Sequence, residues 1–105
     1  MAQIVYLSGE SFEILKIGGA LTFEDKDHLQ RAIESLRPDR TVVLDLRKLD
    51  YLDSSNLAHL LRLSMQDREV RVSEVREEIA KLFRISGITE VFQTISQNDL
   101  ESIMP

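Results

Sequence analysis

The sequence predicts an α/β domain built around a parallel or mixed β-sheet. Segments with strand periodicity alternate with helical segments, and such alternation implies helical crossovers between strands. The near-continuous apolar run at residues 41–46 is typical of a central strand covered on both faces. The chain has 105 residues, enough for one small domain, and we expect residues 1–105 to form it.

Two strands are expected first. Residues 4–7 and 12–17 are apolar and partly alternating, and they flank a short turn at residues 8–10. We expect Gly18 and Gly19 to end the second strand, since glycine weakens a strand interior.

A first helix is expected after these strands. Thr22 has the character of an N-cap, and Asp25 three residues later can reach back to its backbone amide. Pro38 closes the segment. An apolar stripe on one helix face is supplied by Leu29, Ala32, Ile33 and Leu36.

In the second half of the sequence, helical and strand segments continue to alternate. A helix is expected over about residues 54–66, then a strand at 69–73, which alternates strictly. The apolar face of that helix is expected to contain Leu57, Leu60, Leu61 and Met65.

A third helix is expected to begin at the cap Ser73 and to end at Gly87, a residue suited to a left-handed C-terminal position. Its buried side chains are expected to be Val75, Ile79, Leu82 and Phe83. A short strand at 91–95 and a closing helix at 98–104 complete the order β-β-α-β-α-β-α-β-α.

Composition excludes several classes of protein. The chain has no cysteine, so disulfides and thiolate metal sites are impossible. A net charge of −5 argues against a nucleic-acid partner, which needs clustered Lys and Arg. No apolar run approaches a membrane span, and the N-terminus lacks the pattern of a signal peptide. We therefore expect a cytoplasmic protein with no direct membrane insertion.

Enzyme signatures are largely missing. His28 and His59 have no second metal ligand at helical spacing, and no glycine-rich phosphate loop is present. Asp45, Asp50 and Asp53 cluster in sequence, which leaves an acid–base pair open, but strand ends and helix caps commonly carry aspartate. We expect no catalytic residue, no cofactor and no metal.

Residues 49–57 form the most informative segment. They join the central strand to the second helix, and ligands or partners commonly meet an open α/β sheet at such a place. In the purely structural interpretation, Asp53 or Ser54 simply caps the helix. In the functional one, a phosphate on a serine is tolerated by the helix N-terminus but disrupts a docked partner.

Three motifs resemble the STAS domain family, named for sulphate transporters and anti-sigma factor antagonists. An apolar strand at 42–46 precedes a turn and Asp-Ser-Ser-Asn-Leu at 53–57, close to the family pattern Asp-Ser-Ser-Gly-Leu. Residues 80–88 resemble the second signature, and residues 17–21 the first strand-to-helix turn. The resemblance covers essentially the whole chain. It implies a STAS fold, with a mixed central sheet and helices packed mainly on one face.

STAS proteins of this length are mostly bacterial anti-sigma factor antagonists. The resemblance implies that the unphosphorylated form binds an anti-sigma factor with serine kinase activity and so releases a sigma factor. Phosphorylation at Ser54 would end that interaction, and a serine phosphatase would restore it. The residues that the resemblance and the motif assign to partner binding are Thr22, Asp53, Ser54, Ser55, Asn56, Leu57 and His59.

The sequence departs from the family at several points. Asn56 stands where glycine is usual, Thr22 replaces a common acidic residue, and the stretch 54–82 is shorter by about one helical turn. The turn at 20–23 is similar to STAS domains carried by anion transporters. An alternative is therefore a detached regulatory domain acting on an anion or other membrane transporter, without a phosphorylation switch. A small-ligand enzyme is a third possibility.

Overall fold

The computed structural model describes residues 2–104, which form a single β-sheet flanked by helices. The strands are β1 (Gln3–Ser8), β2 (Phe12–Leu21), β3 (Thr41–Leu52), β4 (Val70–Val72) and β5 (Gln93–Thr94). The α-helices are α1 (Lys26–Glu34), α2 (Ser54–Arg62), α3 (Glu77–Ser86), α4 (Ile88–Val91) and α5 (Gln97–Ile103). Two 3-10 turns are η1 (Phe23–Asp25) and η2 (Leu63–Met65). The predicted element order is confirmed, with α4 as an additional single turn.

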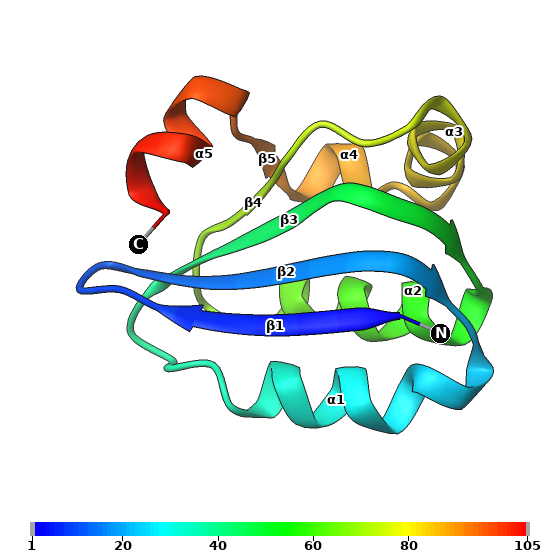
Figure 1. Cartoon of the computed structure of the whole chain (residues 1–105), viewed down its shortest axis with the longest axis horizontal. Helices are drawn as coiled ribbons and strands as arrows, with labels where there is room; N and C mark the ends of the chain where they lie inside the picture. Colours follow the sequence, from blue (N-terminus) through cyan, green and yellow to red (C-terminus); the bar gives the residue numbers. More distant parts are fainter. Residues whose placement is uncertain (1, 105) are drawn as a thin grey trace.

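The sheet is mixed, as predicted. Its strand order is β1-β2-β3-β4-β5, with β1 antiparallel to β2 and the later neighbours parallel. The hairpin β1–β2 has a tight turn, whereas each parallel pair is joined by a helical crossover (Figure 1). No helix within residues 2–104 is long and apolar enough to cross a membrane.

The two faces of the sheet are covered unequally. Side chains from α1 to α4 join a large buried cluster with β2, β3 and β4 on one face. On the other face only α5 contributes, and a small cluster forms around Ile14, Val43, Ile95 and Leu100. In Figure 1 α1 lies below the strands and α2 lies behind β1 and β2, while α5 lies above one end of the sheet. The prediction of helices mainly on one face is confirmed.

Two irregularities in β3 decide which of its side chains reach each face. Lys16 pairs with Asp45 but Gly18 pairs with Lys48, so β3 has one extra residue between these pairs. A second extra residue lies between the pairs Gly19–Leu49 and Ala20–Tyr51. Such bulges shift the alternation by one position. As a result Leu44, Leu46, Leu49 and Leu52 all enter the large cluster, although one residue separates the first two and two residues separate each later pair.

The expected end of β2 at Gly18 and Gly19 is wrong. The strand runs on to Leu21, and the glycines lie where β3 is bulged. Gly19 has a φ of 77°, which other residues rarely adopt, so here glycine permits a local irregularity within the strand rather than terminating it. The neighbouring strand is correspondingly longer than the predicted 41–46 run.

Two expectations in the second half are also wrong. Ser73 does not cap α3, which begins four residues later at Glu77; the Ser73 hydroxyl instead accepts a 2.8 Å hydrogen bond from the Leu46 amide. Met65 is 85% exposed, because the end of α2 tightens into η2 and turns Leu63 inward. The last strand is shorter than predicted, since Val91 belongs to α4. Gly87, with a φ of 85°, ends α3 as predicted.

Candidate functional site at the start of α2

Ser54 is the first residue of α2 and follows the carboxyl end of β3 by two residues. Asp53 is the N-cap: its backbone is extended, and its Oδ1 accepts a 2.9 Å hydrogen bond from the Asn56 amide. Of the two caps that the sequence left open, the structure therefore selects Asp53. The Ser54 side chain is exposed at the N-terminal end of the helix.

The Asp53 carboxylate organises the residues after it. The same Oδ1 accepts hydrogen bonds from the Ser55 hydroxyl at 3.1 Å and from Asn56 Nδ2 at 2.9 Å. The hydroxyl of Ser55 thus binds the cap carboxylate rather than the amides at the helix end. The first hydrogen bond within the helix runs from the Leu57 amide to the Asp53 carbonyl, so the amides of Ser54 and Ser55 precede it.

Asn56 connects α2 to the turn before α1. Its side chain is fully buried, and Nδ2 also donates to the Thr22 carbonyl at 2.7 Å. The Asp53 amide binds the Leu21 carbonyl in the same region. Asn56 therefore fixes the site from beneath the surface, a role that the usual glycine lacks the side chain to fill.

The predicted capping interaction at Thr22 is present. The Thr22 amide donates to Asp25 Oδ2 at 3.0 Å, and this bond is the main reason why the pKa of the buried Asp25 lies below its ordinary value. Thr22 is only partly buried. The turn before α1, which the buried Asn56 side chain binds, is therefore partly exposed, and Ser54 is exposed.

Leu57 and His59 lie below the surface. Leu57 belongs to the large cluster, and His59 is only 9% exposed, with its Nδ1 3.0 Å from Arg62 Nη1. Burial, followed by the nearby charges of Arg62 and Lys26, lowers the pKa of His59. Its ring is therefore neutral at neutral pH and accepts the hydrogen bond from Arg62.

The structure thus brings the seven predicted partner-binding residues together in two layers. Ser54 is exposed, and Thr22, Asp53 and Ser55 are partly exposed beside it. Asn56, Leu57 and His59 form the buried support of that surface.

Two exposed aromatic residues lie close to this site in the sequence, and the sequence argument did not select them. Phe23 is 63% exposed and follows Thr22, while Tyr51 is 54% exposed and lies two residues before Asp53. The Lys26 ammonium lies 4.5 Å from the Phe23 ring centroid, a cation–π contact that favours a fixed ring position. Exposed aromatic side chains beside a motif are a usable signal, because such residues anchor many interfaces.

The arrangement can present a hydroxyl but does not activate it. The His59 imidazole lies in the buried layer with its Nδ1 bound to Arg62, and Asp53 is engaged by Ser55 and Asn56. An oxygen presented in this way can receive a group from another protein, provided that protein supplies the base.

Comparison with known proteins identifies the class. The chain matches the family described as "Mlab, STAS domain" over residues 8–95, and it therefore belongs to the STAS domain family. It is similar to the anti-sigma-B factor antagonist of Staphylococcus aureus (strain NCTC 8325 / PS 47), with 26% identity over 98 residues, covering 88% of this chain and 91% of the relative.

Solved structures share the fold. An anti-sigma factor antagonist from Mycobacterium paratuberculosis has a TM-score of 0.80 at 15% identity, over 98% of this chain and 94% of that one. Unphosphorylated SpoIIAA has a TM-score of 0.73 at 14% identity, over the full length of both chains. The phosphorylated form of SpoIIAA, from Bacillus, has a TM-score of 0.67 at 14% identity, over 97% of each chain.

Proposed function

We propose that this protein is an anti-sigma factor antagonist, controlled by phosphorylation of Ser54. The observation that carries the proposal is an exposed serine at the first position of α2, directly after the Asp53 N-cap, on a STAS fold. The similarity to the staphylococcal antagonist over 88% of this chain supports the antagonist role. The unphosphorylated protein would bind an anti-sigma factor in the bacterial cytoplasm and so release a sigma factor.

The binding partner is proposed to be the kinase as well. Its active site would transfer the γ-phosphoryl group of ATP to Ser54 Oγ: the new O–P bond forms as the bond to ADP breaks. The hydroxyl proton passes to a base of the kinase, because the histidine near this site is buried and bound to Arg62. A serine phosphatase would hydrolyse the ester and regenerate the binding form.

Phosphorylation would act at the surface and leave the fold intact. The phosphate would lie at the N-terminal end of α2, where helix amides and the helix dipole favour an anion. The cap of Asp53 and the buried bonds of Asn56 do not involve the Ser54 side chain, so they would persist. A partner docked over Thr22, Ser54 and Ser55 would instead meet a bulky group with roughly two negative charges.

A phosphorylation assay tests the proposal directly. The protein is incubated with ATP and the anti-sigma kinase encoded nearest to it, and the intact mass is measured. We expect a gain of one phosphate that disappears in Ser54→Ala and persists in Ser55→Ala, the matched control. A phosphate that remains in Ser54→Ala would place the acceptor elsewhere and contradict the proposal.

A charge mimic tests the consequence for binding. Ser54→Asp should keep the wild-type circular dichroism spectrum and unfolding midpoint but lose binding to the same partner. Ser54→Ala should keep both the wild-type fold and the binding to the partner. If Ser54→Asp unfolds, the argument that the helix end accommodates an anion is wrong; if it still binds, the switch is wrong.

A detached regulatory domain for an anion or other membrane transporter is the second candidate. The turn at 20–23 favours it, because this turn is similar to that of the STAS domains carried by anion transporters. In that case no candidate kinase would phosphorylate the protein, and a permease would be recovered with it from membranes.

A further inference from the structure

The uncovered part of the sheet has a hollow of about 390 Å³ across β1, β2 and β3. It lies on the face opposite the large cluster, and no residue of α5 lines it. Its apolar side chains include Val5 and Leu7 of β1, and Val5 is 46% exposed. Its basic side chains are Lys16 of β2 and Arg47 and Lys48 of β3. The hollow therefore combines an apolar side with a cationic side.

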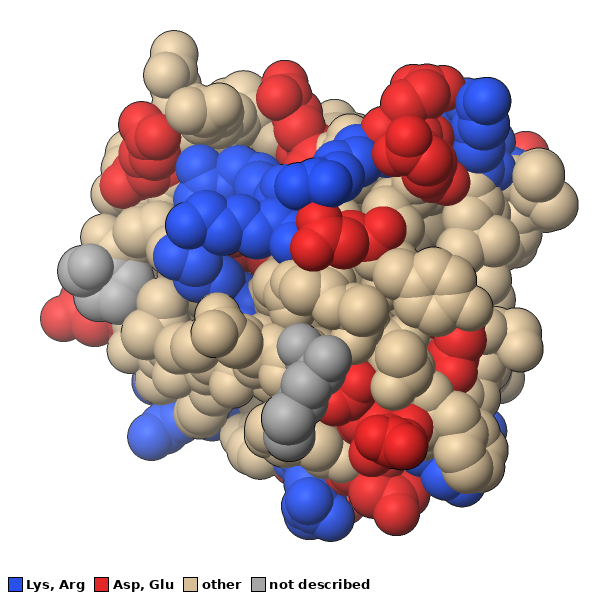
Figure 2. Space-filling model, turned by 45° about the vertical axis from the view of Figure 1, so that its right-hand side comes forward, with Lys and Arg blue, Asp and Glu red and all other residues tan. Residues whose placement is uncertain are grey.

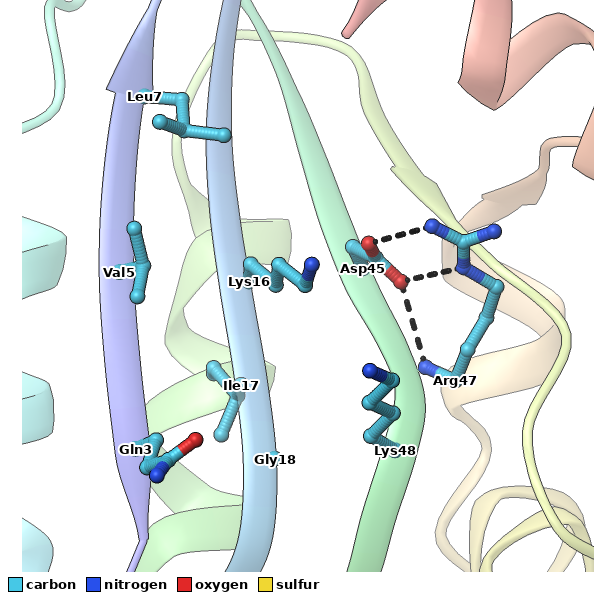
Figure 3. Close-up of a pocket in the computed structure, with 9 residues that line it drawn as sticks. All are labelled: Gln3, Val5, Leu7, Lys16, Ile17, Gly18, Asp45, Arg47 and Lys48. Carbon is cyan, nitrogen blue, oxygen red and sulfur yellow. Dashed lines mark hydrogen bonds and ion pairs between the residues drawn. The ribbon is translucent and has the colours of Figure 1, made fainter.

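The first bulge of β3 creates the cationic side. Because β3 has an extra residue opposite Ile17, Arg47 and Lys48 are consecutive and yet line the same hollow. In Figure 3 the side chains of Lys16 and Lys48 lie beside Asp45, and the dashed lines join Asp45 to Arg47. A regular strand would have turned one of the two basic side chains to the opposite face.

The three cations differ in how far Asp45 neutralises them, although the Lys16 charge also helps to hold the pKa of Asp45 below its ordinary value. Asp45 is 1% exposed and binds Arg47 through bonds of 2.9 Å and 3.0 Å, so that pair is internally neutralised. Neither Lys16 nor Lys48 forms an ion pair with any residue in 2–104. In a chain of net charge −5, Figure 2 shows one larger group of Lys and Arg side chains with acidic residues at its edge, and smaller basic groups elsewhere on this face.

We propose that this hollow binds a small amphiphilic anion, with its charged head group between Lys16 and Lys48 and its apolar part against Val5 and Leu7. The class is an alkyl phosphate or alkyl carboxylate of a few carbon atoms. The volume agrees with such an occupant, because small-molecule sites start at roughly 300 Å³. The site is separate from Ser54 and independent of the proposed switch.

Larger anionic partners fit the surface less well. A membrane-binding basic cluster has about four to eight Lys or Arg residues, and a nucleic-acid surface neutralises a similar number of phosphates. The hollow has three, and one of them is bound to Asp45. Charge complementarity therefore favours one anionic head group.

Calorimetric titration of the full chain with hexyl phosphate and with hexanoate tests the proposal. We expect saturable binding of at least one of them, with hexanol and inorganic phosphate each at least about tenfold weaker. Lys16→Gln and Lys48→Gln should each weaken binding about tenfold, since a hydrogen bond to a charged group contributes that much. Lys81→Gln, an exposed lysine on α3, is the matched control and should bind like the wild type.

A larger side chain at Gly18 should fill the hollow without removing any of its basic residues. A Cβ at Gly18 would lie 3.4 Å from the Lys48 Cβ, and Gly18 has no left-handed backbone angle, so Gly18→Val fills the hollow without backbone strain. It should abolish binding, while Ser54→Ala should leave binding unchanged. Amide NMR shifts should map to β1–β3.

No saturable binding of either anion, equal binding of inorganic phosphate, or shifts confined to the start of α2 would overturn the proposal. Failure of these titrations would leave the phosphorylation assay at Ser54 unaffected, so the two proposals can fail separately.

Discussion

The two faces of the sheet differ in what holds their side chains. On the covered face, leucines of β3 are packed against four helices, the buried Asn56 binds the turn before α1, and the buried His59 binds Arg62 of its own helix. On the open face, the same strand presents Asp45, Arg47 and Lys48 to a hollow. The covered face therefore supplies stability and fixes the serine site, whereas the open face is free to bind. This contrast predicts different responses to substitution.

The largest expected effect is on the covered face. Leu44→Ala should lower the free energy of unfolding by about 2–5 kcal/mol, because it removes a fully buried side chain and leaves a cavity. Its counterpart on the open face, Val5→Ala, should change stability by less than about 0.5 kcal/mol. Urea unfolding of both variants measures the difference. Equal losses would mean that the open face is covered in solution, and the contrast between the faces would fail.

The N-cap of α2 is expected to contribute less. Asp53→Ala removes the acceptor for the Asn56 amide, the Ser55 hydroxyl and one Asn56 Nδ2 bond, and should cost about 1–2 kcal/mol. Asp53→Asn keeps an oxygen in place and is the matched control. Chemical unfolding followed by circular dichroism compares them. If Asp53→Ala left the free energy of unfolding unchanged, the hydrogen bond between Asn56 and the Thr22 carbonyl would be sufficient to fix the start of α2.

The smallest expected effect is on how the stability of the protein depends on pH, and the two faces of the sheet should respond in different pH ranges. Burial lowers the pKa of His59 in the folded protein, so the unfolded chain binds a proton more readily as the pH falls through the ordinary value of 6.5. Stability contributed by neutral His59 is therefore present above that pH and lost below it. His59→Gln should remove most of this loss between about pH 7.5 and pH 5.5, measured by thermal unfolding at each pH.

Asp45 on the open face should respond at lower pH. Burial raises its pKa, but the hydrogen bonds and charge of Arg47 outweigh that effect and hold it below the ordinary value of 3.8. Its contribution is present above 3.8 and disappears as the pH falls through the lower folded value. Asp45→Asn should thus change the pH profile only at the acidic end. If Asp45→Asn instead changed the pH dependence of stability near neutral pH, the prediction that Asp45 acts at lower pH than His59 would be wrong.

Much of the fold follows from local patterns in the sequence. The apolar run at 41–46, the stripe around Leu29 and the glycine at 87 each determine a structure within a few neighbouring residues, and all three are confirmed. The errors at Gly18, Met65 and Ser73 have a different origin. They depend on contacts with distant elements: the bulged register of β3, the tightened end of α2 and the Leu46 amide.

The serine site was predictable in position but not in its internal bonds. The spacing of Asp53, Ser54 and Ser55 indicates a helix start, and the structure places them there. That Asn56 points inward to the Thr22 carbonyl could not be predicted, because the two residues are 34 positions apart in the chain. The basic hollow was also missed, since the predicted strand ended at residue 46 and only the longer, bulged β3 directs Arg47 and Lys48 to the same face.

The bulges of β3 bear on how the length of this strand can change over evolutionary time. Losing either residue of the pair Arg47–Lys48 would return the strand to simple alternation and still leave Leu46 and Leu49 directed into the core. Losing a residue between Val42 and Leu46 would invert every later side chain. Single-residue deletions should therefore be tolerated at the bulges alone within β3, and a deletion at Arg47 or Lys48 would erase the basic hollow.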